Sequence, residues 1–333
     1  MATNSSYTRE TTAQEVVDAF GDEIKGKNVV VTGPSPGGIG AETARAIATK
    51  SPKLLILAGR DQKKLETTKA DILKETPGAN IALVTLDLNS LASVRQAAKD
   101  IAAAADHIDV LINNAAVMMC PYSTTADGLE TQFGTNYVAP WLLTNLLIPS
   151  LLAAPAPRVV FVSSVGHRTS DIRWDDIGFS GGKTYHNVLA YGQSKTASIL
   201  NAVALAEKYP KITAISLHPG AIQTNLGRHL TEEDMKGMVS RFFNEDGTPK
   251  ANMFFKSIPQ GASTTLVAAF DPALKSLNGT YLADCQVAEK KETGDPMQSL
   301  EDAAFVAPYA VDKSAAERLW GVTEEMVNEK FSP

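Results

Sequence analysis

Short runs of apolar, often β-branched residues alternate with helical stretches from Asn28 to about Gly220. Each run is nearly continuous in apolar character, as expected for a strand buried on both faces of a parallel sheet. The runs lie at residues 28–32, 54–58, 81–87, 110–113, 159–164 and 212–218. Because such alternation is typical of βαβ units, it predicts an α/β fold with a doubly wound parallel sheet and helices on both faces.

Three segments depart from this alternation, and we expect them to be additions to one domain over residues 1–333. Thr12 can cap a short helix in an N-terminal helical extension, residues 1–26. Residues 225–259 carry Met and Phe side chains where the chain leaves the last major strand, so they are interpreted as an apolar substrate lid, with helices that merely cover the sheet as the alternative. Residues 286–333 are expected to form a C-terminal helical extension.

Composition narrows the class of protein. The 333 residues are 44% hydrophobic, which is enough for a sizeable core, and the net charge of -6 argues against a nucleic-acid partner. Cys120 and Cys285 are too few for a disulfide framework and suit a reducing compartment, and no metal site is supported. Met1 to Glu10 are polar, and no run of 18 apolar residues occurs. We therefore expect a cytoplasmic protein without a membrane span.

A Gly-rich turn follows the first predicted strand and leads into a helical stretch. It reads Thr32-Gly33-Pro34-Ser35-Pro36-Gly37-Gly38-Ile39-Gly40. Glycines at such a turn let backbone N–H groups and a helix N-terminus approach a pyrophosphate, whereas a bare strand-to-helix turn is the plain alternative. The two prolines remove N–H donors, so Ser35 and the amides after Gly37 are the expected phosphate contacts.

The end of the second predicted strand carries the residues expected to choose the cofactor. Gly59 ends the strand, and Arg60 and Asp61 follow it. A guanidinium at this position suits the 2′-phosphate of NADP(H), while Asp61, if it pointed at the ribose, would permit NAD(H). A solvated Arg60–Asp61 pair opening the next helix is the third interpretation. NADP(H) is favoured, with NAD(H) second.

Tyr191 and Lys195 lie four residues apart on a predicted helix and therefore share one of its faces. A nearby ammonium stabilises a phenolate, so Lys195 is expected to lower the pKa of Tyr191 and make it a working acid. The connection before this helix, residues 166–189, contains His167 and His186. Both histidines are expected at the surface, where either could touch substrate.

These motifs, in this order, resemble the short-chain dehydrogenase/reductase family, and the match runs from about Lys27 to Leu282. The Gly-rich turn looks like the family's Thr-Gly-x-x-x-Gly-x-Gly with one extra residue. The 27 residues from Ser164 to Tyr191 and the segment 279–285 are most similar to the branch of retinol dehydrogenases and WW-domain oxidoreductases. The resemblance implies a Rossmann-type sheet of about seven strands in the order 3-2-1-4-5-6-7.

The resemblance also implies the roles of particular residues. The catalytic tetrad would be Asn136, Ser164, Tyr191 and Lys195. Asn136 would reach Lys195 through water. The cofactor-binding residues would be Gly33, Ser35, Gly38, Ile39, Gly40, Arg60, Asp87, Leu88, Asn113, Ala115, Tyr191, Lys195, Pro219, Ile222 and Thr224. Long helices at about 129–152 and 190–209 form subunit seams in the family, which implies a homodimer or homotetramer.

The activity implied is hydride transfer between NADP(H) and a carbonyl or alcohol carbon, with Tyr191 as general acid or base. The Met- and Phe-rich lid favours a bulky, largely apolar substrate. A catalytically silent NADP-binding scaffold or regulatory protein is the alternative, and a complete tetrad counts against it.

Overall fold

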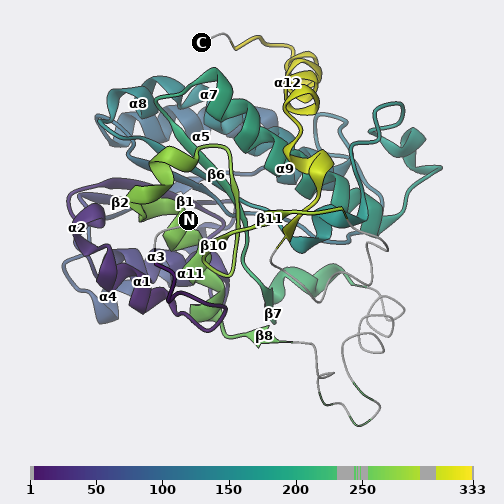
Figure 1. Ribbon diagram of the computed structural model, residues 1–333. Helices are drawn as coiled ribbons and strands as arrows, with labels where there is room; N and C mark the ends of the chain where they lie inside the picture. The colour runs from purple at the N-terminus through teal and green to yellow at the C-terminus, as the bar shows by residue number, and fades with distance from the viewer. Residues whose placement is uncertain are drawn as a thin grey trace.

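The computed structural model describes residues 4–230, 244, 246, 248, 254–292 and 305–331. One mixed sheet runs through the molecule and is almost wholly parallel (Figure 1). Its strands are β1 Asn28–Thr32, β2 Leu54–Gly59, β3 Ile81–Thr85, β4 Val110–Asn113, β5 Arg158–Val162, β6 Thr213–His218, β9 Tyr281–Ala283 and β10 Gln286–Val287. The helices that flank it are α1 Ala13–Ala19, α2 Gly21–Ile24, α3 Ile39–Ala48, α4 Gln62–Glu75, α5 Leu91–Ala104, α6 Thr131–Phe133, α7 Ala139–Leu146, α8 Ile148–Ala153, α9 Asn187–Lys208, α11 Ile258–Phe270 and α12 Lys313–Val327.

The strand order is β3-β2-β1-β4-β5-β6-β9-β10. The expected order 3-2-1-4-5-6-7 is confirmed, with β9 as the seventh strand and β10 as an added antiparallel edge. Several predicted boundaries move by one or two residues, as is usual at strand ends.

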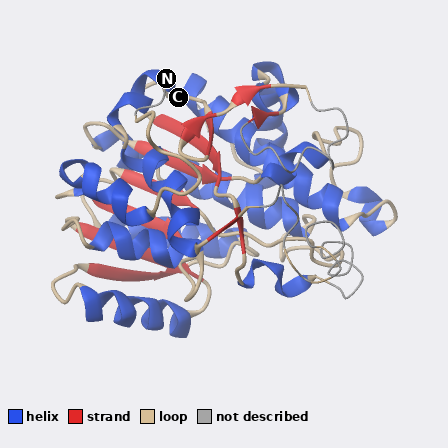
Figure 2. Ribbon diagram, turned by 60° about the horizontal axis from the view of Figure 1, so that its bottom comes forward, coloured by secondary structure: helices blue, strands red, loops and turns tan. Residues whose placement is uncertain are grey.

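Two apolar cores form because successive strand side chains point to opposite faces. Val29 and Val31 of β1 belong to the core under α1, α3 and α11, whereas Val30 between them belongs to the core under α5, α7 and α9. Both faces of the strand are therefore buried, which explains its unbroken apolar sequence. Figure 2 shows helices on both sides of the strands.

The N-terminal residues form two short helices. Thr12 caps α1 and accepts a hydrogen bond from the Glu15 backbone N–H, while the Glu15 carboxylate accepts one from the Thr12 N–H at 2.7 Å. Val16, Val17 and Ile24 are buried, and α1 packs against α3 and α11. The predicted capped helix is therefore present and closes this face of the domain.

Most of the predicted lid, and all its Met residues, lie outside the described residues. The described ends are a 3₁₀ turn, Asn225–His229, and β8, Phe255–Lys256, which pairs with β7, Ala221–Ile222. The predicted lid boundary at residue 259 falls inside α11, whose capping box at Ser257 begins that helix two residues earlier.

The C-terminal extension is not only helical, which corrects the expectation for residues 286–333. It includes β10, β11 Glu289–Lys290 and β12 Phe305–Val306 before α12. Helix α12 packs on α9 and brings Trp320 against Trp141 of α7, with ring centroids 5.0 Å apart. This face of α7 and α9 is thus covered by the chain itself.

Candidate active site

Ser164 and Tyr191 meet at the carboxyl edge of the sheet. Ser164 follows β5 and caps a 3₁₀ turn, Val165–Thr169, by accepting a hydrogen bond from the Gly166 N–H at 3.0 Å. Tyr191 lies in the first turns of α9, and its ring and the Ser164 hydroxyl oxygen both border Gly166. Ser164 after a strand and Tyr191 in a helix, 27 residues apart in the sequence, are thus brought close together.

Lys195 lies one helical turn beyond Tyr191, as its spacing predicts. Its Nζ donates to the Val162 carbonyl at 3.0 Å and lies 5.6 Å from the centroid of the Tyr191 ring. Burial lowers the pKa of Lys195 to about 8, because the charged ammonium is removed from water.

The expected lowering of the Tyr191 pKa does not occur. Burial raises the pKa of Tyr191 to about 12, and the hydrogen bond from Ser164 lowers it only in part. The phenolate would be desolvated, and the Lys195 ammonium faces a backbone carbonyl instead of the phenol oxygen. The phenol therefore holds its proton at neutral pH.

Asn136 lies in a π-helical turn, Gly134–Val138, between α6 and α7. Its side-chain carbonyl accepts from the Val117 N–H at 2.8 Å, and its Nδ2 donates to the Val117 carbonyl at 2.9 Å and the Ser194 hydroxyl at 3.0 Å. The Asn136 backbone carbonyl accepts a hydrogen bond from the Ser198 hydroxyl at 3.3 Å. Asn136 thus joins the loop after β4 to α9, beside Lys195, instead of presenting its amide to Lys195. π turns of this kind are frequent at functional sites.

The prediction that His167 lies at the surface was wrong, whereas His186 is exposed as predicted. His167 is fully buried, its Nε2 accepts from the Ala307 N–H at 3.1 Å, and its Nδ1 therefore donates to the Ser164 carbonyl at 2.7 Å. The C-terminal segment at β12 supplies this burial, which no local sequence pattern reveals. Burial lowers the pKa of His167 to about 3.

Gln132 is a residue that the sequence interpretation missed. It is fully buried one turn before Asn136 and accepts from the Met119 N–H at 2.8 Å. Its Nε2 donates to the Tyr185 hydroxyl at 2.8 Å and to the Asn187 carbonyl at 2.9 Å. Gln132 therefore joins the loop after β4 to the loop before α9, and its i,i+4 spacing from Asn136 is the signal that could have revealed it.

The Gly-rich turn has the close approach that a pyrophosphate site needs. Gly33 has φ +68°, and a Cβ atom there would lie 2.7 Å from Ala115. Gly38 begins α3 with no side-chain cap, so the first N–H groups of this helix are left for another acceptor. A side chain at Gly40 would overlap Asn114. These features fit the pyrophosphate of a dinucleotide.

Beside this turn the strand order reverses between β1 and β4, which is the position where open α/β sheets bind dinucleotides. The Thr32 hydroxyl accepts from the N–H groups of Asn114 and Ala115 at 3.0 and 3.1 Å, and Asn114 Nδ2 donates to the Thr32 carbonyl at 2.9 Å. The Asn113 side chain instead donates to Thr144 of α7 at 3.1 Å. The sequence interpretation chose Asn113 and missed Asn114, the side chain that shapes the turn.

Arg60 and Asp61 separate in the structure. Asp61 caps α4, accepting from the Lys64 N–H at 3.2 Å, and its other carboxylate oxygen lies 3.9 Å from the Lys64 ammonium. The carboxylate is therefore turned back to its own helix. Arg60 is exposed, and no ion pair joins it to any residue in the described part of the chain.

The remaining predicted cofactor residues line the same edge of the sheet. Asp87 and Leu88 follow β3, and the Asp87 carboxylate accepts from the Asn89 N–H at 3.0 Å. Ile222 lies in β7 against Gly261 of α11. The other members are Ser35, which is exposed in the turn, Ile39, which begins α3, Pro219, which follows β6, and Thr224, which caps the 3₁₀ turn after β7.

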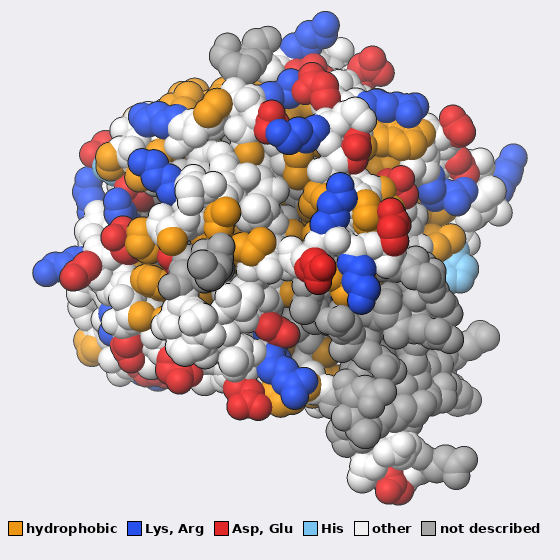
Figure 3. All heavy atoms as spheres, viewed as in Figure 1, with side chains coloured by type: hydrophobic (Ala, Val, Ile, Leu, Met, Phe, Trp, Pro, Cys, Tyr) orange, Lys and Arg blue, Asp and Glu red, His pale blue; other side chains and the backbone are white. Residues whose placement is uncertain are grey.

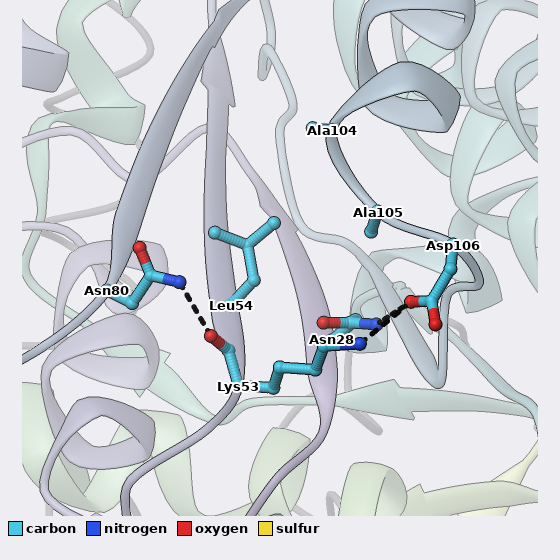
Figure 4. A pocket seen from close by; sticks show the side chains of 7 residues that line it. All are labelled: Asn28, Lys53, Leu54, Asn80, Ala104, Ala105 and Asp106. Carbon is cyan, nitrogen blue, oxygen red and sulfur yellow. Dashed lines mark hydrogen bonds and ion pairs between the residues drawn. The ribbon is translucent and has the colours of Figure 1, made fainter.

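A hollow of about 460 Å³ lies at the opposite, amino edge of the sheet (Figure 4). Its lining residues are Asn28, Lys53, Leu54, Asn80, Ala104, Ala105 and Asp106. Lys53 and Asp106 pair there at 3.0 Å, and the hollow contains no tetrad residue. Figure 3 shows cationic and anionic side chains interspersed over one face of the molecule.

Comparison with known proteins assigns the family. The family model for short chain dehydrogenase matches residues 27–235. The chain therefore belongs to the short-chain dehydrogenase/reductase family of oxidoreductases, near its retinol dehydrogenase branch.

The particular relatives span most of the chain. Short-chain dehydrogenase/reductase prx1 of Penicillium roqueforti is 38% identical, covering 92% of this chain and 86% of its own. Retinol dehydrogenase 12 of Mus musculus is 36% identical, with 92% and 87% covered. Short-chain dehydrogenase TIC 32 A, chloroplastic, of Brassica napus is 35% identical, with 98% and 96% covered.

Solved structures share the fold. A protein from Mycobacterium paratuberculosis aligns with a TM-score of 0.68 at 28% identity, covering 93% of this chain and 96% of its own. A short chain dehydrogenase from Shigella flexneri, solved with NADP, has a TM-score of 0.58 at 22% identity, with 80% and 99% covered. In the described part of this chain, no helix has the length and apolar character needed to cross a membrane.

Proposed function

We propose that this protein is an NADP(H)-dependent oxidoreductase that transfers hydride between nicotinamide and a carbonyl or alcohol of a bulky, largely apolar substrate. The observation that carries the proposal is the juxtaposition of the Ser164 hydroxyl and the Tyr191 ring, which both border Gly166, one helical turn from Lys195. Two adjacent hydroxyl donors are what a substrate oxygen requires as negative charge develops on it.

Three side chains have different roles at the substrate oxygen. A bound nicotinamide supplies the hydride. Tyr191, protonated because its pKa is raised to about 12, donates a proton to the oxygen as general acid. In the reverse direction its deprotonated form would accept the proton of an alcohol. Ser164 donates a hydrogen bond to the same oxygen. Lys195 is the nearby positive charge that stabilises the tyrosinate left after proton transfer.

NADP(H) is proposed over NAD(H) because of the arrangement at the end of β2. A carboxylate that bound the ribose hydroxyls would select NAD(H), but Asp61 is engaged in capping α4. Arg60 is exposed and available for a 2′-phosphate. The Shigella protein that shares the fold was solved with NADP, which supports the same choice.

The apolar substrate class is supported by the residues at the described edges of the site. Val117, Met118 and Met119 follow β4 beside Asn136, and all three are half-buried. Leu226 and Leu230 lie near the end of β7 and are half-buried as well. Relatives at 36% identity are named for retinol, an apolar alcohol.

The homodimer or homotetramer implied by the family would need a subunit interface different from the one expected at the long helices. Helix α12 of the same chain covers a face of α7 and α9, so a subunit interface at that face would have to displace Trp320 from Trp141.

We propose a cytoplasmic location from the two unpaired cysteines, Cys120 and Cys285.

The test is NADPH consumption against a panel of apolar aldehydes and ketones, with wild type beside Tyr191→Phe. Turnover of the variant should fall at least about a hundredfold, as for loss of a general acid, while NADPH binding measured by fluorescence is unchanged. Tyr209→Phe, at the far end of α9, is the matched control and should retain activity. An unchanged rate in Tyr191→Phe would remove the phenol from the chemistry, and NADPH binding without turnover on any carbonyl would favour the silent scaffold.

A further inference from the structure

Lys256 lies near the end of the predicted lid segment, residues 225–259, where the chain returns to pair with β7. It ends β8, which pairs in parallel with β7, and Ile222 is its partner in the register. The short β7–β8 sheet therefore connects the returning chain to residues 219–224, which include the predicted cofactor-binding residues Pro219, Ile222 and Thr224.

The aliphatic part of Lys256 lies directly on Gly220. A Cβ atom at Gly220 would lie 2.5 Å from Cδ and 2.9 Å from Cε of Lys256, and Gly220 has φ +108°. Only glycine permits both this backbone conformation and this approach. The lysine stem thus restrains the backbone of the segment between β6 and β7.

The buried Lys256 ammonium pairs with Asp284, whose side chain is partly exposed. Its Nζ lies 2.6 Å from the Asp284 carboxylate, and only 2% of the Lys256 side chain is exposed. Because a buried charge without a partner is strongly destabilising, Asp284 determines where the ammonium lies.

Asp284 is itself held in an unusual backbone conformation. Asp284 and Cys285 have φ +49° and +63°, which non-glycine residues adopt at an energetic cost. The Thr264 hydroxyl of α11 accepts from the Cys285 N–H at 3.1 Å and secures this turn. Such strain persists where the surroundings enforce it, and here it presents a carboxylate to Lys256.

The other end of the segment is joined to the catalytic serine. His218 ends β6 immediately before Pro219, and its Nδ1 accepts from the Val165 N–H, next to Ser164, at 3.1 Å. Residues 218–222 are thus fastened to the Ser164 turn at one end and to Lys256 at the other.

We propose that Lys256 is a positioning residue which, through its ion pair with Asp284, holds residues 219–224 where they orient the nicotinamide ring toward Tyr191. This inference rests on the proposed NADP(H)-dependent function. The adenosine half of the cofactor would bind at a different place, at Arg60 and the Gly-rich turn. Loss of Lys256 should impair the nicotinamide half alone.

The test compares two ligands that differ only in the nicotinamide. Dissociation constants for NADPH and for 2′-phospho-ADP-ribose are measured by calorimetry on wild type and Lys256→Met, which keeps the stem and removes the charge. The variant should bind NADPH at least about fivefold more weakly, with 2′-phospho-ADP-ribose unchanged. Its kcat should fall about 10- to 100-fold, as for a misplaced reacting group.

Two further variants make the outcome decisive. Asp284→Asn should raise the ratio of the NADPH to the 2′-phospho-ADP-ribose dissociation constant, as Lys256→Met does. The double variant should bind NADPH no more weakly than Lys256→Met, because the two residues act as one unit. Lys27→Met is the matched control, since Lys27 pairs with buried Asp109 at 3.3 Å at the amino edge of the sheet, and it should leave the ratio unchanged.

Each result has one meaning. If wild type binds neither ligand, the proposed function fails. If wild type binds both but Lys256→Met and Asp284→Asn keep the wild-type ratio and kcat, the function stands and the role of Lys256 is overturned. A change in melting temperature without a change in the ratio would likewise assign Lys256 to stability alone.

Discussion

The ring of Tyr191 lies on the backbone of Gly166, so that a Cβ atom at Gly166 would be 2.9 Å from Cε1 of the ring and 3.4 Å from the Ser164 hydroxyl oxygen. The phenol and the serine hydroxyl therefore share a space that only the absence of a side chain provides. The position of the ring therefore depends on Gly166 having no side chain.

Gly166→Ala should consequently reduce turnover by about tenfold or more, because a displacement of even 1 Å at a reacting group is costly. NADPH affinity should be nearly unchanged, which a fluorescence titration would check. Gly178→Ala in the same connection is the control, since a Cβ atom there meets nothing within 4 Å. Equal kcat values in the two alanine variants would show that the ring does not depend on this contact.

Arg60→Ala should weaken NADPH binding by about 10- to 100-fold, the worth of hydrogen bonds to a charged phosphate. NADH binding should not change, because NADH lacks the 2′-phosphate. Lys63→Ala, which removes another exposed cation at the start of α4, serves as control. Parallel losses for NADPH and NADH in Arg60→Ala would contradict the assignment.

Stability should fall with acidity because of His167. Its folded-state pKa of about 3 lies below the ordinary 6.5, so between these values the unfolded chain binds more protons than the folded one. The free energy of unfolding should therefore decrease as pH falls below 6.5, by up to about 1.4 kcal/mol per pH unit from this group. Above pH 6.5 the contribution is constant.

Urea unfolding at pH 7.5 and 5.0 measures the slope. His167→Asn keeps a donor for the Ser164 carbonyl but cannot be protonated, so its stability should depend less on pH than that of wild type. His186→Gln changes an exposed side chain and should retain the wild-type slope. Identical slopes for wild type and His167→Asn would show that His167 is not the group responsible.

Trp320→Ala should destabilise the fold by about 3–5 kcal/mol, because it removes a large side chain that is 3% exposed and packed on Trp141. Gly321→Ala should have the opposite sign, a gain of about 0.5–1 kcal/mol, since a Cβ atom there lies in open space within α12. Chemical denaturation checks both, and size-exclusion chromatography shows whether uncovering α7 and α9 promotes association.

Patterns that depend on neighbours in the chain were predictable. Continuous apolar runs identified the six principal strands, and the spacing of Tyr191 and Lys195 placed both on one face of α9. The capped helix at Thr12 followed from the same local rules. These features are fixed by side-chain periodicity and capping, which act within a few residues.

Features that depend on contacts between distant segments of the chain were not predictable from the sequence. His167 was predicted to lie at the surface, yet the segment at β12, about 140 residues later in the chain, buries it. Asp61 could have faced a ribose, and only its capping of α4 showed that it does not.

The sequence by itself determined the principal strands, the capped helix at Thr12 and the shared helix face of Tyr191 and Lys195, because these follow from periodicity, capping and spacing within a few residues. The tertiary structure decided the protonation of the site and the supports around it. Burial lowers the pKa of Lys195 to about 8 and raises that of Tyr191 to about 12, and the raised pKa of Tyr191 is the opposite of the lowering expected from the spacing. Desolvation depends on everything packed around a group, and no stretch of sequence contains that information.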